Sequence, residues 1–180
     1  MKYFKHIIIF IFINFLAFSS FANEFVGIIG AGVGEVKNQN NQKLENGSKI
    51  FYGDTIIVGS KSTAQVLFLD QTVMTLGEDS ELTIDEFVYD PQTNDGKFVS
   101  NIKSGTIKII TGKISKKDPD NLEIKIPTGA IGARGTEFVV LANYKNENTV
   151  LLLGPGPNNS LGMTPGNLEV TDGVNSVNII

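Results

Sequence analysis

The residue types that usually carry catalysis are scarce in this sequence. Its single histidine, His6, lies in an apolar N-terminal stretch, and the chain has no cysteine. Ser-His-Asp triads, Cys-His pairs and the usual zinc ligand sets each require one of these two residue types. We therefore predict no catalytic residue of these classes and no zinc site downstream of that stretch.

Paired carboxylates are the remaining catalytic possibility. Glu78, Asp79 and Glu81 lie close together in sequence, and Asp85 and Glu86 follow them. A glycosidase needs two carboxyl groups about 5–9.5 Å apart across a sugar cleft. Neither the spacing nor the aromatic content singles out such a pair, and the chain has no tryptophan. Because unpaired acids are normally exposed, we favour solvated strand ends and keep a carbohydrate-active enzyme as the second alternative.

Oxygen ligands and glycine-rich segments give no clear cofactor site either. Asp70 and the turn formed by Asp118, Asp120 and Asn121 offer oxygens to calcium, but no EF-hand or Gly-Asp repeat surrounds them. The glycine-rich stretch at residues 30–34 precedes no helical pattern and lacks the P-loop lysine. We therefore favour an ordinary acidic turn, and we predict no metal and no cofactor.

The first 22 residues have the three parts of a secretory signal. Lys2 and Lys5 form a positive head, residues 7–18 form an apolar run, and Ser20 and Ala22 are small residues at the cleavage positions. The run is shorter than the roughly 20 residues that a membrane span needs. We predict cleavage after Ala22 and a periplasmic or secreted protein, with an uncleaved anchor as the alternative.

Charge restricts the possible partners of the mature chain. Cleavage would remove two of the 15 basic residues and none of the 19 acidic ones, which leaves 13 against 19. Nucleic acids and anionic membranes select for lysine and arginine, so we predict neither as a partner. No second long apolar stretch follows, and we therefore predict no membrane span in the mature chain.

After the leader, short β-prone runs alternate with turn signals such as Asn46-Gly47, Gly53-Asp54 and Asp172-Gly173. No segment outside the leader shows a helical apolar stripe. The runs cover residues 24–36, 49–52, 55–58, 64–69, 72–76, 81–89, 98–102, 106–111, 122–126, 136–142, 149–153, 168–171 and 174–180. We predict an all-β fold with short strands in a β-solenoid-like or β-sandwich-like single domain.

After the leader, we predict a main β domain at residues 23–153, followed by a loop and a C-terminal hairpin or tail at residues 154–180. Within the main domain, the charged residues 113–121 indicate an exposed loop.

Alternation along residues 81–89 predicts one polar face that is a possible partner surface. The residues of that face are Glu81, Thr83, Asp85, Phe87 and Tyr89.

The only arginine of the chain, Arg134, lies in residues 126–141, which we expect to tie the sheet layers together. A guanidinium beside a buried strand requires partners. We favour an internal ion pair with Asp54, Asp70 or Glu137, and we expect Arg134→Ala to lower stability. The alternative is that Arg134 binds an anionic ligand or a carboxylate of a partner.

Taken together, residues 42–141 resemble the FecR domain, the periplasmic part of FecR-type regulators. The strongest piece is Ala133-Arg134-Gly135-Thr136-Glu137-Phe138, which follows Ile126-Pro127-Thr128. Earlier matching pieces include Leu44 to Gly47, Tyr52 to Ile56, Ser62 to Phe68, Leu76 to Ile84 and Gly105 to Ile107. The motif residues are Gly53, Asp54, Asp70, Pro127, Thr128, Arg134, Gly135, Thr136, Glu137 and Phe138.

The resemblance implies an exported sensing and binding domain without enzymatic activity, whose partner is a protein or an envelope polymer. Complete regulators of this family also hold a cytoplasmic segment that binds an extracytoplasmic-function sigma factor, and a transmembrane helix. Only a leader precedes the domain here, so we expect a stand-alone exported FecR domain. The first alternative is a component of siderophore-type cell-surface signalling that regulates a sigma factor through separate membrane partners.

Overall fold

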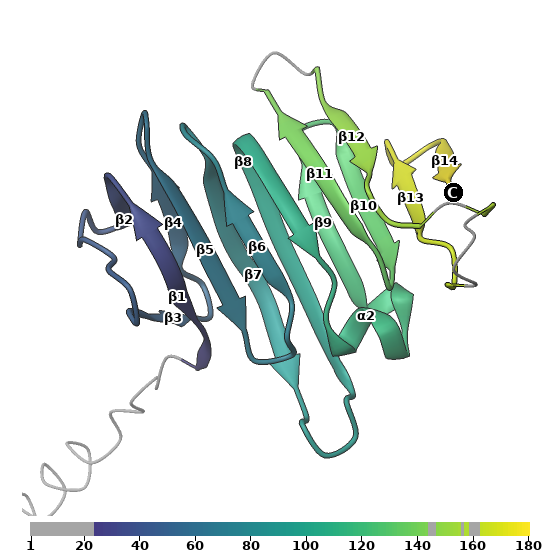
Figure 1. Ribbon diagram of the computed structural model, residues 1–180, viewed down its shortest axis with the longest axis horizontal. Helices are drawn as coiled ribbons and strands as arrows, with labels where there is room; N and C mark the ends of the chain where they lie inside the picture. The colour runs from purple at the N-terminus through teal and green to yellow at the C-terminus, as the bar shows by residue number, and fades with distance from the viewer. Residues whose placement is uncertain (1–23, 144–146, 156, 159–162) are drawn as a thin grey trace, which may run out of the picture.

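The computed structural model describes residues 24–143, 147–155, 157–158 and 163–180. The predicted leader, residues 1–22, lies outside the described residues. Fourteen strands in the described part of the chain form one hydrogen-bonded network, which folds into two facing layers (Figure 1). We call these layers sheet A and sheet B. The all-β prediction is confirmed, and the arrangement is a two-layer sandwich.

Sheet A is antiparallel throughout. Its strands, in spatial order, are β3 (Lys49–Phe51), β1 (Phe25–Val33), β5 (Thr63–Phe68), β6 (Val73–Leu76), the second half of β8 (Gly96–Ile110), β11 (Glu137–Ala142) and β12 (Thr149–Leu152).

Sheet B contains the one parallel pair of the described strands, β8 with β9. Its strands, in spatial order, are β2 (Val36–Asn38), β4 (Thr55–Val58), β7 (Glu81–Tyr89), the first half of β8, β9 (Leu122–Ile126), β10 (Gly129–Arg134), β13 (Asn167–Thr171) and β14 (Ser176–Ile179). The chain therefore advances along the long axis while it alternates between layers (Figure 1).

Strand β8 belongs to both layers. Residues up to Ser104 pair with β7, and residues from Gly105 onward pair with β11. Gly105 has a φ of 94°, a backbone conformation that favours glycine, and a Cβ there would collide with Ser80. The predicted break at Ser104-Gly105 is thus a bend at which one strand crosses between the sheets.

Apolar side chains from the inner faces of both sheets form the core. Phe68 of sheet A lies 4.7 Å from Phe98 and 5.9 Å from Phe87 of sheet B, measured between ring centroids. Aromatic contacts of this kind add to the stabilisation from apolar burial. Core burial holds the fold together, since the chain has no cysteine to form a disulfide.

Strand β7 does not keep the predicted alternation. A register shift between Ile84 and Glu86 inserts a bulge, which moves every later residue to the opposite face. As a result, Phe87 is only 2% exposed and lies in the core, whereas Val88 is 55% exposed. The prediction that Phe87 and Tyr89 belong to a polar outer face is therefore wrong, because Tyr89 also packs against the core.

The segment after β8 also differs from the prediction of an exposed loop. It forms a short helix, α2 (Lys113–Lys117), and a 3-10 turn, η1 (Pro119–Asn121). Ile114 and Ser115 are buried because they face the end of the sandwich. The hydroxyl of Ser115 donates a hydrogen bond to the carbonyl of Ala133 and so attaches α2 to β10.

Strand β10 is not among the predicted runs, because a glycine such as Gly132 weakens a strand pattern. It pairs with β9 on one side and with β13 on the other. The predicted C-terminal hairpin is confirmed as β13 and β14, and Leu168 of β13 is fully buried in the core. Within the described ranges, no helix has the length and apolar character needed to span a bilayer.

Candidate functional site

Two of the predicted motif residues, Asp70 and Thr136, belong to a buried polar cluster that also contains Thr72, Thr111 and Gly112. We call this cluster the buried junction. Asp70 is fully buried in the turn between β5 and β6. Its carboxylate accepts hydrogen bonds from the backbone N–H of Thr72 (3.0 Å) and from the Thr72 hydroxyl (2.8 Å). The Thr72 oxygen in turn accepts from the backbone N–H of Gly112 (3.0 Å). The turn is thereby fixed to the end of β8.

Burial raises the pKa of Asp70, and the hydrogen bonds from Thr72 oppose that increase without cancelling it. No cation neutralises this carboxylate in the described structure; its hydrogen bonds come from neutral donors. Asp70 therefore acts as a buried acceptor that positions the chain.

Thr111 and Thr136 connect the end of β8 to the start of β11. The Thr111 hydroxyl donates to the carbonyl of Thr136 (3.0 Å) and accepts from its backbone N–H (2.8 Å). The Thr136 hydroxyl is itself buried without a hydrogen-bond partner among the described residues. The backbone of Thr136, and not its side chain, thus supplies the connection.

The remaining motif residues occupy other turns and strands. Asp54 accepts a hydrogen bond from the N–H of Phe51 (2.9 Å), and Gly53 has a φ of 81° in the same turn. Pro127 and Thr128 form the exposed turn between β9 and β10. These roles are conformational: the side chain and the backbone shape tight turns.

At the start of β11, the motif contributes one surface ion pair and one core residue. Glu137 lies 2.6 Å from Lys108, and Phe138 is fully buried. Gly135, just before the strand, has a φ of 54°. The sequence prediction that this segment ties the layers together is confirmed, because β10 lies in sheet B and β11 in sheet A.

Arg134 does not make the predicted buried ion pair. Side chains alternate along β10, so Ile131 and Ala133 face the core while Gly132 and Arg134 face outward. Arg134 is exposed, and no ion pair to it occurs among the described residues. The preferred interpretation of Arg134 as an internal structural cation is therefore wrong, which leaves its guanidinium available at the surface.

Most of the predicted partner face along β7 is already engaged. Glu81 lies 2.6 Å from Lys103, and Asp85 lies 3.1 Å from Lys125. The hydrogen bond to Asp85 raises the pKa of Lys125. Between Glu81 and Asp85, the Thr83 hydroxyl forms a hydrogen bond with the Thr55 hydroxyl at 2.9 Å. Beyond the bulge, the Tyr89 hydroxyl donates to the side-chain oxygen of Asn94 at 2.8 Å.

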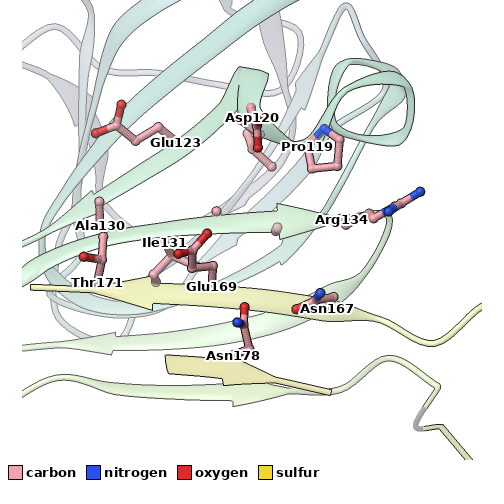
Figure 2. Close-up of a pocket in the computed structure, with 13 residues that line it drawn as sticks. Pro119, Asp120, Glu123, Ala130, Ile131, Arg134, Asn167, Glu169, Thr171 and Asn178 are labelled. Atoms are coloured by element: carbon pink, nitrogen blue, oxygen red, sulfur yellow. The ribbon is translucent and has the colours of Figure 1, made fainter. Parts of the chain in front are cut away.

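A shallow polar groove lies on the outer face of sheet B (Figure 2). It has a volume of about 480 Å³ and lies over β9, β10, β13 and β14, with η1 at one side. Its floor is low because Gly132 has no side chain, and a Cβ there would meet no atom within 4 Å. We call this site the acidic groove.

Cross-strand pairing brings the groove's carboxylates together. Glu123 of β9 and Glu169 of β13 both lie opposite Gly132, one on each side of it. Asp120 of η1 and Arg134 also line the site, and no lysine occurs among its described lining residues (Figure 2). Three carboxylates and one guanidinium can bind cationic and hydrogen-bonding groups, such as those of a peptide.

Little in the sequence indicated this groove. Glu123 lies in the predicted run at residues 122–126, but Glu169 and Asn178 come from the C-terminal hairpin, far along the chain. Only the pairing of β13 with β10 places them beside Gly132. The available sequence signal was Gly132, because a glycine inside a strand leaves a gap in the row of side chains.

No group of three or more Asp, Glu, His or Cys residues lies close enough to hold a metal ion in the described part of the chain. Of the possible calcium ligands, Asp118 accepts hydrogen bonds from the Asp120 N–H (3.2 Å) and the Asn121 amide (3.1 Å). It therefore caps η1, while Asp70 lies in the buried junction.

Comparison with known proteins gives one family match. A family model described as FecR protein matches residues 54–154. Neither the search of curated proteins nor the search of solved structures found a match. The matched range contains the buried junction and Arg134, but it ends before β13 and β14, which complete the acidic groove.

Proposed function

Because this chain belongs to the FecR protein family, we propose that it is an exported, non-catalytic domain that binds a protein or an envelope polymer in cell-surface signalling. The family is a signalling family, and its role implies protein contacts. Export is our interpretation of the leader at residues 1–22, and it agrees with the usual periplasmic location of FecR domains.

The acidic groove is the observation that carries this proposal. Its carboxylates and Arg134 face solvent on a rigid sheet, and no ion pair between them occurs in the described structure. Elsewhere on the outer face of sheet B, the charged side chains of β7 are paired with lysines. Charged side chains without ion pairs inside the protein are available to an external partner.

The state of the other carboxylates supports a binding role over glycoside hydrolysis. Glu81, Asp85 and Glu86 each pair with a different lysine, at 2.6, 3.1 and 2.8 Å. A hydrolase needs one protonated and one ionised carboxyl facing the same cleft. Each of these three carboxylates is instead engaged by a lysine at the surface of sheet B.

The test is affinity capture with the full chain produced in its native cell and tagged at the C-terminus. Partners would be fixed by short-range cross-linking and identified by mass spectrometry, with cell fractionation in parallel. The groove variant is Gly132→Leu, which fills the open space above the floor. The matched control is Thr75→Leu, which adds an apolar side chain to the outer face of sheet A.

We expect an envelope partner with the wild type and the control, and its loss with Gly132→Leu. We also expect the protein outside the cytoplasm, shortened by its leader. A partner that binds all three proteins equally would contradict the groove as the site. A cytoplasmic protein with its leader intact would contradict the exported function.

A further inference from the structure

Strand β14 has a free edge beside the acidic groove. It pairs with β13 on one side, and no described strand pairs with its other side. Natural edge strands are usually protected by lysine, proline or a bulge, because an open edge is a template for another strand. Residues 174–180 contain no charged residue and no proline. The edge therefore presents unprotected backbone donors and acceptors.

The row of inward-facing apolar residues becomes increasingly exposed to solvent toward this edge. Ile131 of β10 lies opposite Val170 of β13, which lies opposite Val177 of β14. Along this row Ile131 is fully buried, Val170 is half-buried and Val177 is 62% exposed. Burying Val177 would remove apolar surface from water, which is favourable. An added strand with an apolar residue at this position would extend the core row.

The outward row has the opposite character. Glu123, Gly132, Glu169 and Asn178 lie opposite one another across β9, β10, β13 and β14. Figure 2 shows Glu169 and Asn178 projecting from the neighbouring strands β13 and β14. A strand added beside Asn178 would lie about 10 Å from Glu169, a distance that a lysine or arginine spans together with the glutamate. Charge complementarity thus favours a basic residue at the outward positions of that strand.

We propose that β14 accepts an extended segment of a partner protein as an additional strand, whose side chains alternate between apolar residues inward and basic residues outward. This inference rests on the proposed function, and it specifies the partner's chemistry. A second copy of the chain fits less well, because a second β14 would offer serine and asparagine at the outward positions. Main-chain bonds supply affinity in this mode of recognition, and the alternating side chains supply specificity.

The test uses the full chain and synthetic peptides as probes. One peptide alternates valine and lysine, and its matched partner alternates valine and glutamate. Binding would be measured by fluorescence anisotropy, and the contact would be located by amide hydrogen exchange. The edge variant is Val177→Lys. Its control is Val33→Lys, because Val33 is 64% exposed on β1 at the opposite end of the sandwich.

We expect the lysine peptide to bind about tenfold more tightly than the glutamate peptide, because Glu169 attracts a lysine and repels a glutamate at the outward position within its reach. Binding should protect residues 176–179 from exchange. Val177→Lys should weaken binding about tenfold or more while leaving the melting temperature and circular dichroism unchanged, and Val33→Lys should have no effect. Glu169→Lys should reverse the preference between the two peptides while retaining binding, and Glu169→Gln should abolish it.

Three results would overturn this inference. They are equal binding of the two peptides, protection at β12 instead of β14, and a dimer in sedimentation that Val177→Lys dissociates. If neither peptide binds but the cellular partner is still captured and lost in Gly132→Leu, strand addition is wrong and the proposed function stands. If no partner is captured either, both are wrong.

Discussion

Only Gly135 separates the acidic groove from the buried junction along the chain, between Arg134 and Thr136, yet the polar groups of the two sites are used in opposite ways. In the junction, Asp70 and Thr111 have internal hydrogen-bond partners and are excluded from solvent. In the groove, Arg134 and Glu169 are exposed, without ion pairs among the described residues. The junction fixes the geometry, and the groove offers groups to a partner.

A family motif can consist of residues needed for folding or of residues that bind a partner, and this difference distinguishes the two. The motif segment from Ala133 to Phe138 contains two outward side chains, Arg134 and the ion-paired Glu137, among residues that bend the chain or fill the core. A motif match therefore reports mainly on folding here. The residues that distinguish a binding surface, such as Glu169, lie beyond the matched range.

The largest effect is expected from Asp70→Ala. The substitution leaves the backbone N–H and the hydroxyl of Thr72 buried without their acceptor. The free energy of unfolding should fall by about 2 kcal/mol, measured by urea denaturation. Asp70→Asn keeps one acceptor oxygen and should cost less. Equal stability of Asp70→Ala and the wild type would contradict the structural role of the junction.

The two threonines of the junction should respond in opposite directions. Thr111→Val removes a hydroxyl that both donates and accepts, and it should lower the free energy of unfolding by about 1–2 kcal/mol. Thr136→Val removes a buried hydroxyl that has no described partner, and it should leave stability unchanged or raise it by up to about 1 kcal/mol. Matched thermal melts would measure both. A larger loss for Thr136→Val than for Thr111→Val would reverse our assignment.

The raised pKa of Asp70 predicts a pH-dependent contribution to stability. Between the ordinary value of 3.8 and the raised folded value, the folded state holds a proton that the unfolded state has released. Stability from this group is therefore full below the ordinary value and declines as pH rises through that window. The difference in unfolding free energy between wild type and Asp70→Asn should shift against the wild type with rising pH. A difference independent of pH would contradict the raised pKa.

The smallest effect is expected from Arg134→Ala. Because the guanidinium is exposed and unpaired in the described structure, the free energy of unfolding should change by less than about 0.5 kcal/mol. Capture of the cellular partner should nevertheless weaken. A loss of about 3–5 kcal/mol in chemical denaturation would instead indicate a buried ion pair.

Much of the fold could be read from local patterns. The β-prone run at residues 122–126 predicted β9, and Asp172-Gly173 predicted the turn between β13 and β14. The bulge in β7 could not be predicted. One extra residue in the pairing turns Phe87 to the opposite face of the strand, and the composition of the segment does not indicate this shift. Strand β10 was missed because its glycine imitates a turn signal.

By itself, the sequence determined the all-β class, the short strands and the family, because these depend on local propensity and on motif order. The tertiary structure alone decided which residues face one another: it placed Arg134 outside, set Glu123 and Glu169 on either side of Gly132, and left β14 at an edge. The physical reason is that pairing between distant strands depends on how both layers bury their apolar faces together, and no short stretch of sequence contains that information.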